Sequence, residues 1–530
     1  ARVEVVGAGE NDWYRVRVNA RGEIESIYDK DLGRELLDGT ANTFPVFRPN
    51  SRDGASPQVI GAMAFGTGGH PSSLGTEGEL YYDYNGPVYR YLGTGGTLAK
   101  PLYVRLHGEY ATWDLLHPPS IDGGPFGGLT LENDEPVSTL AVAAALRASV
   151  PVEKTGPGEV VLAGGMRGAA PLDLQVRQGR MVISNATDLA FGEVGVTNFS
   201  ASAMPELVLA DVKGTLGTGN IRVGGRNSQQ AARLVISNCT LTSSVLQGMG
   251  QALGTAGGIY AGSAGRGIVE IVGRDTVVSN CVGAGIQLPS SYQSCGAVYL
   301  REGEVSIPAK SFNLVGPTGT YGYYEVSGGT LNTYASTYIG GDGNSCQAVF
   351  ALLGGAMTHA DNSFRVGVGS GSASARKMVH FYHKAGTLTS NGMNIRDWGA
   401  YLNIHAIYTL DGPDALFKSS AGIQMVFGNG GKGTGVIAYF NLNNGGTVRS
   451  NSRTTRNGRE PESKAFVSFD GGVYDFTGST GETGTGLFGG SELDETTRVH
   501  RVTLAAKGAT IRVAKDKSAS LWTPLEAPTK

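Results

Sequence analysis

The chain has 530 residues, of which 82 are glycine, 40% are hydrophobic and 17% are charged, and its net charge at pH 7 is −3. Glycine is about twice as frequent as in an ordinary globular domain, yet there is no strict Gly-X-Y period, which excludes collagen. The hydrophobic content is too high for a disordered chain. Acidic and basic residues are interspersed, so we expect no nucleic-acid partner, which would need a concentrated basic face.

The N-terminal sequence and the apolar runs predict neither a retained signal peptide nor a membrane span. No apolar run is long enough for a membrane-spanning helix, so we expect no transmembrane segment. The opening residues, ARVEVVGAGE, lack the charged, apolar and small-residue regions of a signal peptide. We expect that a signal has been removed and that the chain is a piece of a longer protein.

Residues 1–150 predict a β-rich N-terminal region that is either a cap or a β-sandwich. The segment Trp13 to Leu36 alternates polar and apolar residues around Arg21-Gly22 and Lys30-Asp31, which predicts a hairpin or meander. It resembles the opening strands of the β-sandwich in some mannosidase-type glycosidases.

A second hairpin is predicted at Asn85-Gly86-Pro87, between two tyrosine-rich strands. Its tyrosines are candidate glycan-binding residues that could stack on sugar rings. Aromatic cross-strand pairing inside a sandwich is the alternative. The tyrosines are Tyr81, Tyr82, Tyr84, Tyr89 and Tyr91.

The next block carries the most specific motif. VEKTGPGEVVLAGG begins at Val152, and LDLQVRQGRMVIS follows from Leu172. Together they resemble the passenger-associated repeat of autotransporter proteins, with Pro157 and valine in place of leucine as departures. The matching positions are Lys154, Thr155, Gly156, Gly158, Val160, Leu162 and Gly164, then Leu174, Val176, Gly179, Met181 and Ile183. The resemblance implies a parallel β-helix on a secreted protein and no particular activity.

A glycine-punctuated unit recurs in the second half of the chain. Its equivalent glycines are Gly303, Gly329, Gly355, Gly386 and Gly446, with gaps of 26, 26, 31 and 60 residues. The last gap holds a degraded copy near Leu410 to Gly412. Such a period predicts a solenoid, in which each unit buries its apolar face against its neighbours.

These patterns predict an all-β protein in which a right-handed parallel β-helix occupies residues 151–530. Each coil of about 26 residues would hold three short strands and three turns. The closing stretch, Val502 to Lys530, resembles one more strand–turn–strand unit and has no polar cap. Because solenoids need capped ends, we expect the helix to continue beyond this chain.

Catalytic residues are not identified, and neither a metal site nor a cofactor is expected. The acids of the second half are spread along the chain, without the paired carboxylates of a glycosidase. Arg365 and Arg396 each lie ten residues after a repeat glycine. In register, they would form an anion site for a glycan uronate or sulfate. A solvated pair balanced by Asp361 and Asp397 is the alternative.

Histidine and cysteine do not add a metal site. His380 and His383 are three residues apart on a predicted strand, so they should point to opposite faces. The spacing of Cys239, Cys281, Cys295 and Cys346 is not that of metal ligands. Cys239 and Cys281 would lie two coils apart, too far for a disulfide. Buried thiols are favoured, and the pairs Cys281–Cys295 and Cys295–Cys346 stay open.

The sequence favours a non-enzymatic role over an enzyme. The predicted function is an extracellular structural or adhesive segment of a surface-displayed or secreted bacterial protein. End-to-end or lateral self-association into fibres is compatible with it, since uncapped end coils invite strand addition. The alternative is a carbohydrate-active enzyme or a glycan-binding module, since the fold alone does not decide function. An enzyme should place acids and bases, with flanking aromatic residues, at one strand position over three or more consecutive coils, whereas the sequence indicates two coils at most.

Overall fold

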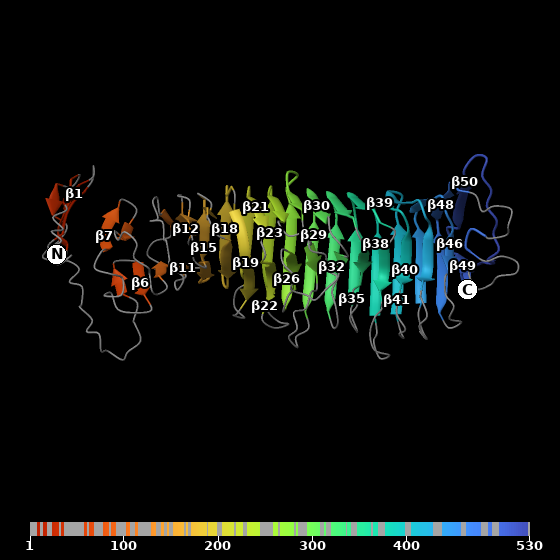
Figure 1. Ribbon diagram of the computed structural model, residues 1–530, viewed down its shortest axis with the longest axis horizontal. Helices are drawn as coiled ribbons and strands as arrows, with labels where there is room; N and C mark the ends of the chain where they lie inside the picture. The colour runs from red at the N-terminus through yellow and green to blue at the C-terminus, as the bar shows by residue number, and fades with distance from the viewer. Residues whose placement is uncertain are drawn as a thin grey trace.

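The computed structural model is an all-β rod whose strands stack along its long axis (Figure 1). The predicted parallel β-helix is thereby confirmed; its handedness stays a prediction. The structure describes residues 8–10, 14–18, 24–30, 33–35, 58–60, 63–67, 78–83, 86–91, 102–106, 112–114, 129–133, 139–142, 146–147, 152–163, 166–167, 171–187, 189–198, 204–216, 219–225, 231–243, 258–262, 265–279, 282–284, 294–307, 312–313, 320–334, 336–340, 347–361, 364–368, 377–397, 404–427, 437–456, 463–478, 486–489 and 498–527.

One sheet, called sheet 1 below, runs along the rod with sixteen parallel strands in chain order. Its strands are β10 (Thr112–Asp114), β12 (Thr139–Val142), β15 (Glu159–Leu162), β18 (Arg180–Ser184), β20 (Glu206–Ala210), β23 (Ala231–Ser237), β26 (Arg266–Val272), β29 (Cys295–Leu300), β32 (Tyr321–Val326), β35 (Gln347–Leu352), β38 (Lys377–His383), β41 (Ile404–Asp411), β44 (Ile437–Asn443), β47 (Lys464–Asp470), β49 (Arg501–Leu504) and β51 (Leu525–Glu526).

Sheet 2 forks at its longest strand. β19 pairs with β21 through Leu189–Phe191 and with β22 through Val194–Asn198, so the sheet continues as two branches. The strands are β5 (Gln58–Ile60), β6 (Met63–Thr67), β9 (Leu102–Leu106), β11 (Leu129–Asn133), β14 (Val152–Thr155), β17 (Leu172–Val176), β19 (Leu189–Asn198), β21 (Lys213–Leu216), β22 (Ile221–Gly225), β24 (Thr240–Ser243), β25 (Ile259–Ala261), β27 (Val277–Ser279), β28 (Val282–Ala284), β30 (Glu304–Ile307), β33 (Thr330–Thr333), β36 (Ala356–His359), β39 (Gly386–Ser390), β42 (Ala415–Ser419), β45 (Thr447–Ser450), β48 (Gly472–Phe476) and β50 (Ala509–Val513).

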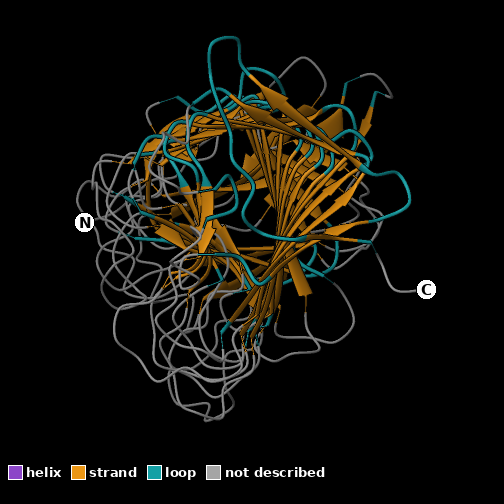
Figure 2. Ribbon diagram, turned by 90° about the vertical axis from the view of Figure 1, so that its right-hand side faces the viewer, coloured by secondary structure: helices purple, strands orange, loops and turns teal. Residues whose placement is uncertain are grey.

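Sheet 3 forms the third side of the later coils and has six parallel strands. They are β31 (Phe312–Asn313), β34 (Thr337–Ile339), β37 (Phe364–Val368), β40 (Met393–Asp397), β43 (Ile423–Phe427) and β46 (Thr454–Arg456). Seen along the rod, the sheets surround a common interior (Figure 2). The predicted three strands per coil are therefore present in this part of the chain.

The N-terminal strands are antiparallel, as their hairpin signals predict. β1 (Ala8–Glu10), β2 (Tyr14–Val18), β3 (Ile24–Asp29) and β4 (Arg34–Glu35) form a meander, and β7 (Gly78–Asp83) pairs with β8 (Gly86–Tyr91). A short parallel pair joins β13 (Leu146–Arg147) to β16 (Met166–Arg167). Parallel stacking reaches back to Leu102, which pairs with Leu129. The domain division at residue 150 stays a prediction.

The two halves of the passenger-associated motif are consecutive coils stacked in register. Val152 pairs with Leu174, and Val160 pairs with Met181. The Lys154 side chain is fully buried, and its Nζ donates to the backbone carbonyls of Thr155 (2.5 Å), Gly156 (2.6 Å) and Gln178 (3.1 Å). A buried ammonium needs such partners. The motif lysine therefore joins a turn to the coil stacked on it.

The repeat glycines also stack in register, as the spacing predicts. The pairs Glu304–Thr330, Thr330–Ala356 and Ala356–Thr387 place each preceding glycine beside the next one. Between Gly386 and Gly446 the equivalent residue is Ala415, three positions beyond the expected copy. The 60-residue gap thus divides into coils of 29 and 31 residues.

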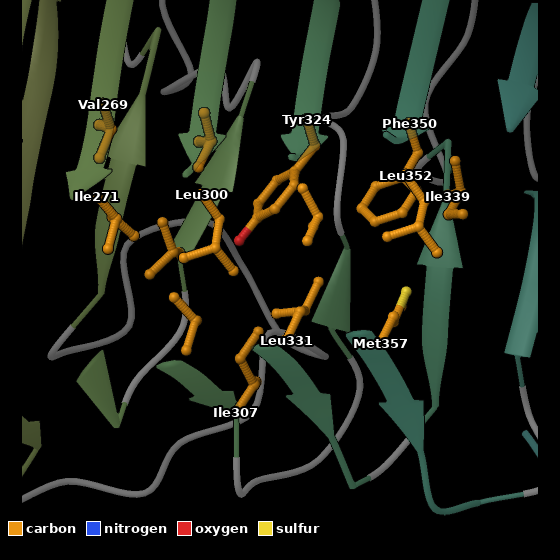
Figure 3. Packing of buried hydrophobic residues seen from close by; sticks show 14 of the residues in the cluster. Val269, Ile271, Leu300, Ile307, Tyr324, Leu331, Ile339, Phe350, Leu352 and Met357 are labelled. Atoms are coloured by element: carbon orange, nitrogen blue, oxygen red, sulfur yellow. The ribbon is translucent and has the colours of Figure 1, made fainter. Parts of the chain in front are cut away.

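Alternating side chains fill the interior as a continuous core. Tyr324 and Phe350 of sheet 1 face Leu331 and Met357 of sheet 2 (Figure 3). Tyr324 and Phe350 belong to a column of five aromatic rings on sheet 1, in which the centroids of successive rings are 4.8–5.5 Å apart. They are Tyr324, Phe350, Phe381, Tyr408 and Phe440, each fully buried. Strand stacking therefore turns one repeated sequence position into an aromatic ladder.

A comparison of two glycines separates the effect of close packing on stability from the effect of the left-handed backbone conformation. Gly355 and Gly508 both have φ of +69°, but a Cβ at Gly355 would collide with the Gly329 carbonyl oxygen, whereas Gly508 has nothing within 4 Å. We expect Gly508→Ala to cost about 1 kcal/mol through its left-handed conformation. Gly355→Ala should cost about 1–3 kcal/mol more because the backbone must shift. Guanidinium denaturation followed by circular dichroism measures both; equal midpoints would contradict the packing argument.

Candidate functional site

The tyrosine-rich hairpin is placed only by its backbone. Tyr82 pairs with Pro87, and Leu80 pairs with Tyr89, which confirms the antiparallel hairpin, although Gly86 and Pro87, expected in its turn, lie within β8. Tyr91 pairs with Gly78 at the open end of the hairpin. Tyr84 and the side chains of the other tyrosines lie outside what the structure describes. Glycan binding by this group stays a prediction.

Arg365 and Arg396 lie on adjacent strands but are not direct partners, so the exact register expected of them is wrong, while the anion site itself stays a prediction. Arg365 pairs with Asn394, two residues before Arg396. The cause is the length of the corner between sheets 2 and 3: four residues separate β36 from β37, but two separate β39 from β40. The same offset from a repeat glycine therefore reaches different strand positions. The side chain of Arg396 is outside the described part.

Arg365 instead contacts a tyrosine on the preceding coil. Its guanidinium carbon lies 5.1 Å from the Tyr338 ring centroid, and its Nη1 donates to the Tyr338 hydroxyl at 3.3 Å. Such stacking is a cation–π contact. Pairing continues the same column through Asn394, Gln424 and Thr455, all partly exposed. Sheet 3 thus presents a polar column that the glycine spacing alone did not reveal.

The outer face of sheet 1 begins with a column of alternating charge, called the charge column here. Its pairing order is Glu159, Arg180, Glu206 and Arg233. The ion pairs between neighbours span 2.5, 3.0 and 2.7 Å, and Arg233 also reaches Glu270 at 3.0 Å. The paired carboxylates raise the pKa of Arg233, with the Glu270 hydrogen bond as the largest cause. The ionisable groups therefore join consecutive coils.

Farther along, the same strand position becomes apolar and aromatic. We call this column the apolar strip; pairing orders it as Tyr323, Val349, His380, Ile407, Tyr439 and Phe466. All six side chains are partly exposed. Beside the strip, Tyr321 and Met378 are 43% and 56% exposed. Sequence reasoning missed this surface because its members come from six strands far apart in the chain.

The polar atoms of the apolar strip and of the side chains that border it form hydrogen bonds mainly to one another. The Tyr323 hydroxyl donates to Glu325 Oε2 at 2.7 Å, and Tyr382 donates to Asp411 Oδ2 at 2.9 Å. Burial, followed by the hydrogen bond to Glu325, raises the pKa of Tyr323. Three further contacts continue the border: His380–Thr409, Asn441–Thr409 and Ser468–Asn441. These bonds hold the border in place between coils.

The two histidines of β38 point to opposite faces, as their spacing predicts. His380 lies on the outer face, and His383 is fully buried. His383 Nδ1 lies 3.1 Å from the Tyr408 hydroxyl, and its Nε2 lies 2.9 Å from the Gly386 carbonyl oxygen. Burial lowers the pKa of His383 to about 4, since the charged ring loses its hydration. Burial likewise lowers the pKa of His359 to about 4.

Two cysteines fall within the described residues, and both are free thiols: Cys239 is buried and Cys295 is partly exposed. Burial raises the pKa of Cys239, whose Sγ lies 3.2 Å from the Ser237 carbonyl oxygen. Cys281 and Cys346 lie outside the described ranges. Where side chains are described, no group of three or more His, Cys, Asp or Glu residues is placed to hold a metal ion. In the same part of the chain, no helix has the length and apolar character needed to cross a membrane.

Comparison with known proteins gives no relative from which to transfer a function. No family model, no curated protein and no solved structure matches this chain. The resemblance to the passenger-associated repeat therefore depends on the motif at residues 152–183 alone.

The buried histidine yields a pH-dependence test. The ordinary histidine pKa is about 6.5, so the unfolded chain binds the proton first as the pH falls. The stability that depends on neutral His383 is complete above about pH 6.5 and is lost between about pH 6.5 and 4. This loss should reach about 3 kcal/mol at pH 4. We expect His383→Gln to reduce the dependence of the unfolding midpoint on pH, with the part due to His359 remaining, as measured by denaturant titration from pH 7.5 to 4.

The matched control is His405→Gln, because His405 is an exposed histidine on the neighbouring strand of sheet 1. An unchanged pH dependence in His383→Gln would contradict the assignment of acid sensitivity to the buried ring.

Proposed function

We propose that this chain is an extracellular structural or adhesive segment of a surface-displayed or secreted bacterial protein. The observation that carries the proposal is the use of the outward-facing ionisable groups. In the charge column, each internal member bridges two neighbouring coils, as Arg180 does between Glu159 and Glu206. The column does place acids and bases at one strand position over four consecutive coils, as expected of an enzyme, but these groups neutralise one another, whereas in an active site they converge on one substrate position. Pairing along the axis suits a rod that resists deformation.

The extracellular location in this proposal is inferred from the passenger-associated motif at residues 152–183. The buried Lys154 and the stacked Gly156 and Gly179 give the passenger-associated resemblance a physical basis in coil stacking. In autotransporter-type proteins that repeat accompanies secretion, which is the support for an extracellular role.

A glycan-binding module is the second candidate. It is favoured by the polar column of sheet 3, where Arg365 lies on Tyr338 and is followed by Asn394 and Gln424. Amide and guanidinium groups on consecutive coils are suitable hydrogen-bonding partners for an extended sugar chain. A glycan array tests it, with Arg365→Ala as the variant that should lose binding.

A degradation screen tests the structural role against an enzymatic one. The purified chain is incubated with neutral, uronate-containing and sulfated polysaccharides, and release of reducing ends or unsaturated products is measured. We expect no release above the level of heat-denatured protein, because the paired charges do not converge on a bond. Electron microscopy of the same sample should show straight rods. Product formation that Arg365→Ala or Arg396→Ala abolishes would overturn the structural role.

A further inference from the structure

The side chains on the outer face of sheet 1 change from ion-paired to mainly apolar between β26 and β29. Up to Arg233 and Glu270 its side chains form ion pairs, which suit a face in water. From β32 to β47 the equivalent central position holds the apolar strip, in which His380 is the one side chain that ordinarily titrates near neutral pH, and Arg501 follows in β49. Burial lowers the pKa of that histidine, which favours its neutral form. The backbone arrangement is the same in both halves, so the difference lies in the side chains.

The aromatic rings of the strip already have partners above their faces. Tyr439 and Phe466 stack with centroids 5.5 Å apart and planes 26° from parallel. The Arg501 guanidinium lies 5.4 Å from the Phe466 centroid. At the other end, Tyr299 lies 5.6 Å from Tyr323 and carries Arg301 at 5.2 Å. A sugar ring would need an open ring face, whereas a packed strip suits contact with another protein surface.

The composition and size of the strip fit a protein interface. Tyrosine, phenylalanine, methionine and arginine are enriched in interface centres, and lysine and glutamate are depleted there. The outer face of these six strands, which comprises the apolar strip and flanking side chains such as Met378 and Lys464, covers about 30 Å by about 20 Å at about 4.8 Å per strand. Two such surfaces in contact would bury roughly 1,200 Å² in total, above the roughly 1,000 Å² that a specific interface needs.

We propose that the apolar strip binds a second copy of this chain, side by side and antiparallel. This inference depends on the proposed structural role and gives the rod a lateral contact. A twofold axis between β38 and β41 makes the strip complementary to itself, as an isologous dimer requires. The ring of Tyr439 then meets the smaller side chain of Val349, and Ile407 meets His380. The charge column of each copy lies outside the contact and keeps its own ion pairs.

Sedimentation velocity over a concentration series tests the dimer. We expect the wild-type chain to dimerise at roughly micromolar concentrations, as interfaces of this size commonly do. Ile407→Glu places two carboxylates near the twofold axis and should weaken dimerisation at least about tenfold. Val182→Glu is the matched control, since Val182 is partly exposed on the same face beside the charge column. It should dimerise like the wild type.

Met378→Lys is the second variant, because Met378 is 56% exposed and its replacement should leave folding intact. Circular dichroism and resistance to protease check the fold of each variant. A wild-type chain that stays monomeric over the whole series would overturn the proposal. So would a dimer that Ile407→Glu and Met378→Lys leave intact, or a monomer that binds a polysaccharide through the strip. Polysaccharide cleavage by an intact dimer would refute the structural role and leave the dimer in place.

Discussion

Backbone hydrogen bonding between consecutive coils at a fixed register is the constraint on which the rest of this molecule depends. Each internal strand of sheets 1 and 3 has a parallel partner on either side, so one strand position becomes a column along the rod. A side chain at such a position meets its own equivalents at about 4.8 Å per coil. The properties of each face of the rod therefore depend on which residue type recurs at the same strand position in consecutive coils.

Three columns illustrate this effect. At the interior position of sheet 1, the column from Tyr324 to Phe440 becomes a stack of buried rings. At the outer position of the same sheet, glutamate and arginine alternate and neutralise one another. At the turns of sheet 2, glycine recurs from Gly303 to Gly386, because a Cβ there would meet the carbonyl oxygen of the preceding coil, and Ala415 then takes the equivalent position. Each column is stable for a different physical reason, although the backbone pairing is the same.

The sequence predicted those features that follow from local spacing. The glycines at Gly303, Gly329 and Gly355 stack as expected, since turns between strands of similar length keep the period constant. The opposite orientation of His380 and His383 follows from strand alternation alone. The alignment of Arg365 with Arg396 failed because it crosses a corner whose length varies from coil to coil. The burial of Lys154 was not predicted, since its partners are carbonyl groups of turns, which no residue pattern encodes.

The strands of the apolar strip carry one more indication of how sheet 1 is used. Parallel strands that are buried on both faces have nearly continuous apolar sequences, whereas strands with one wet face alternate. At the central outward position, β44 (IAYFNLN) and β47 (KAFVSFD) carry Tyr439 and Phe466, whereas β18 (RMVIS) and β20 (ELVLA) carry Arg180 and Glu206; the exposed Lys464 begins β47 at the edge of the same face. The later coils thus resemble a sheet whose outer face is covered. A second copy of the chain would supply that cover and would complete the same two-sided packing that parallel sheets have inside larger proteins.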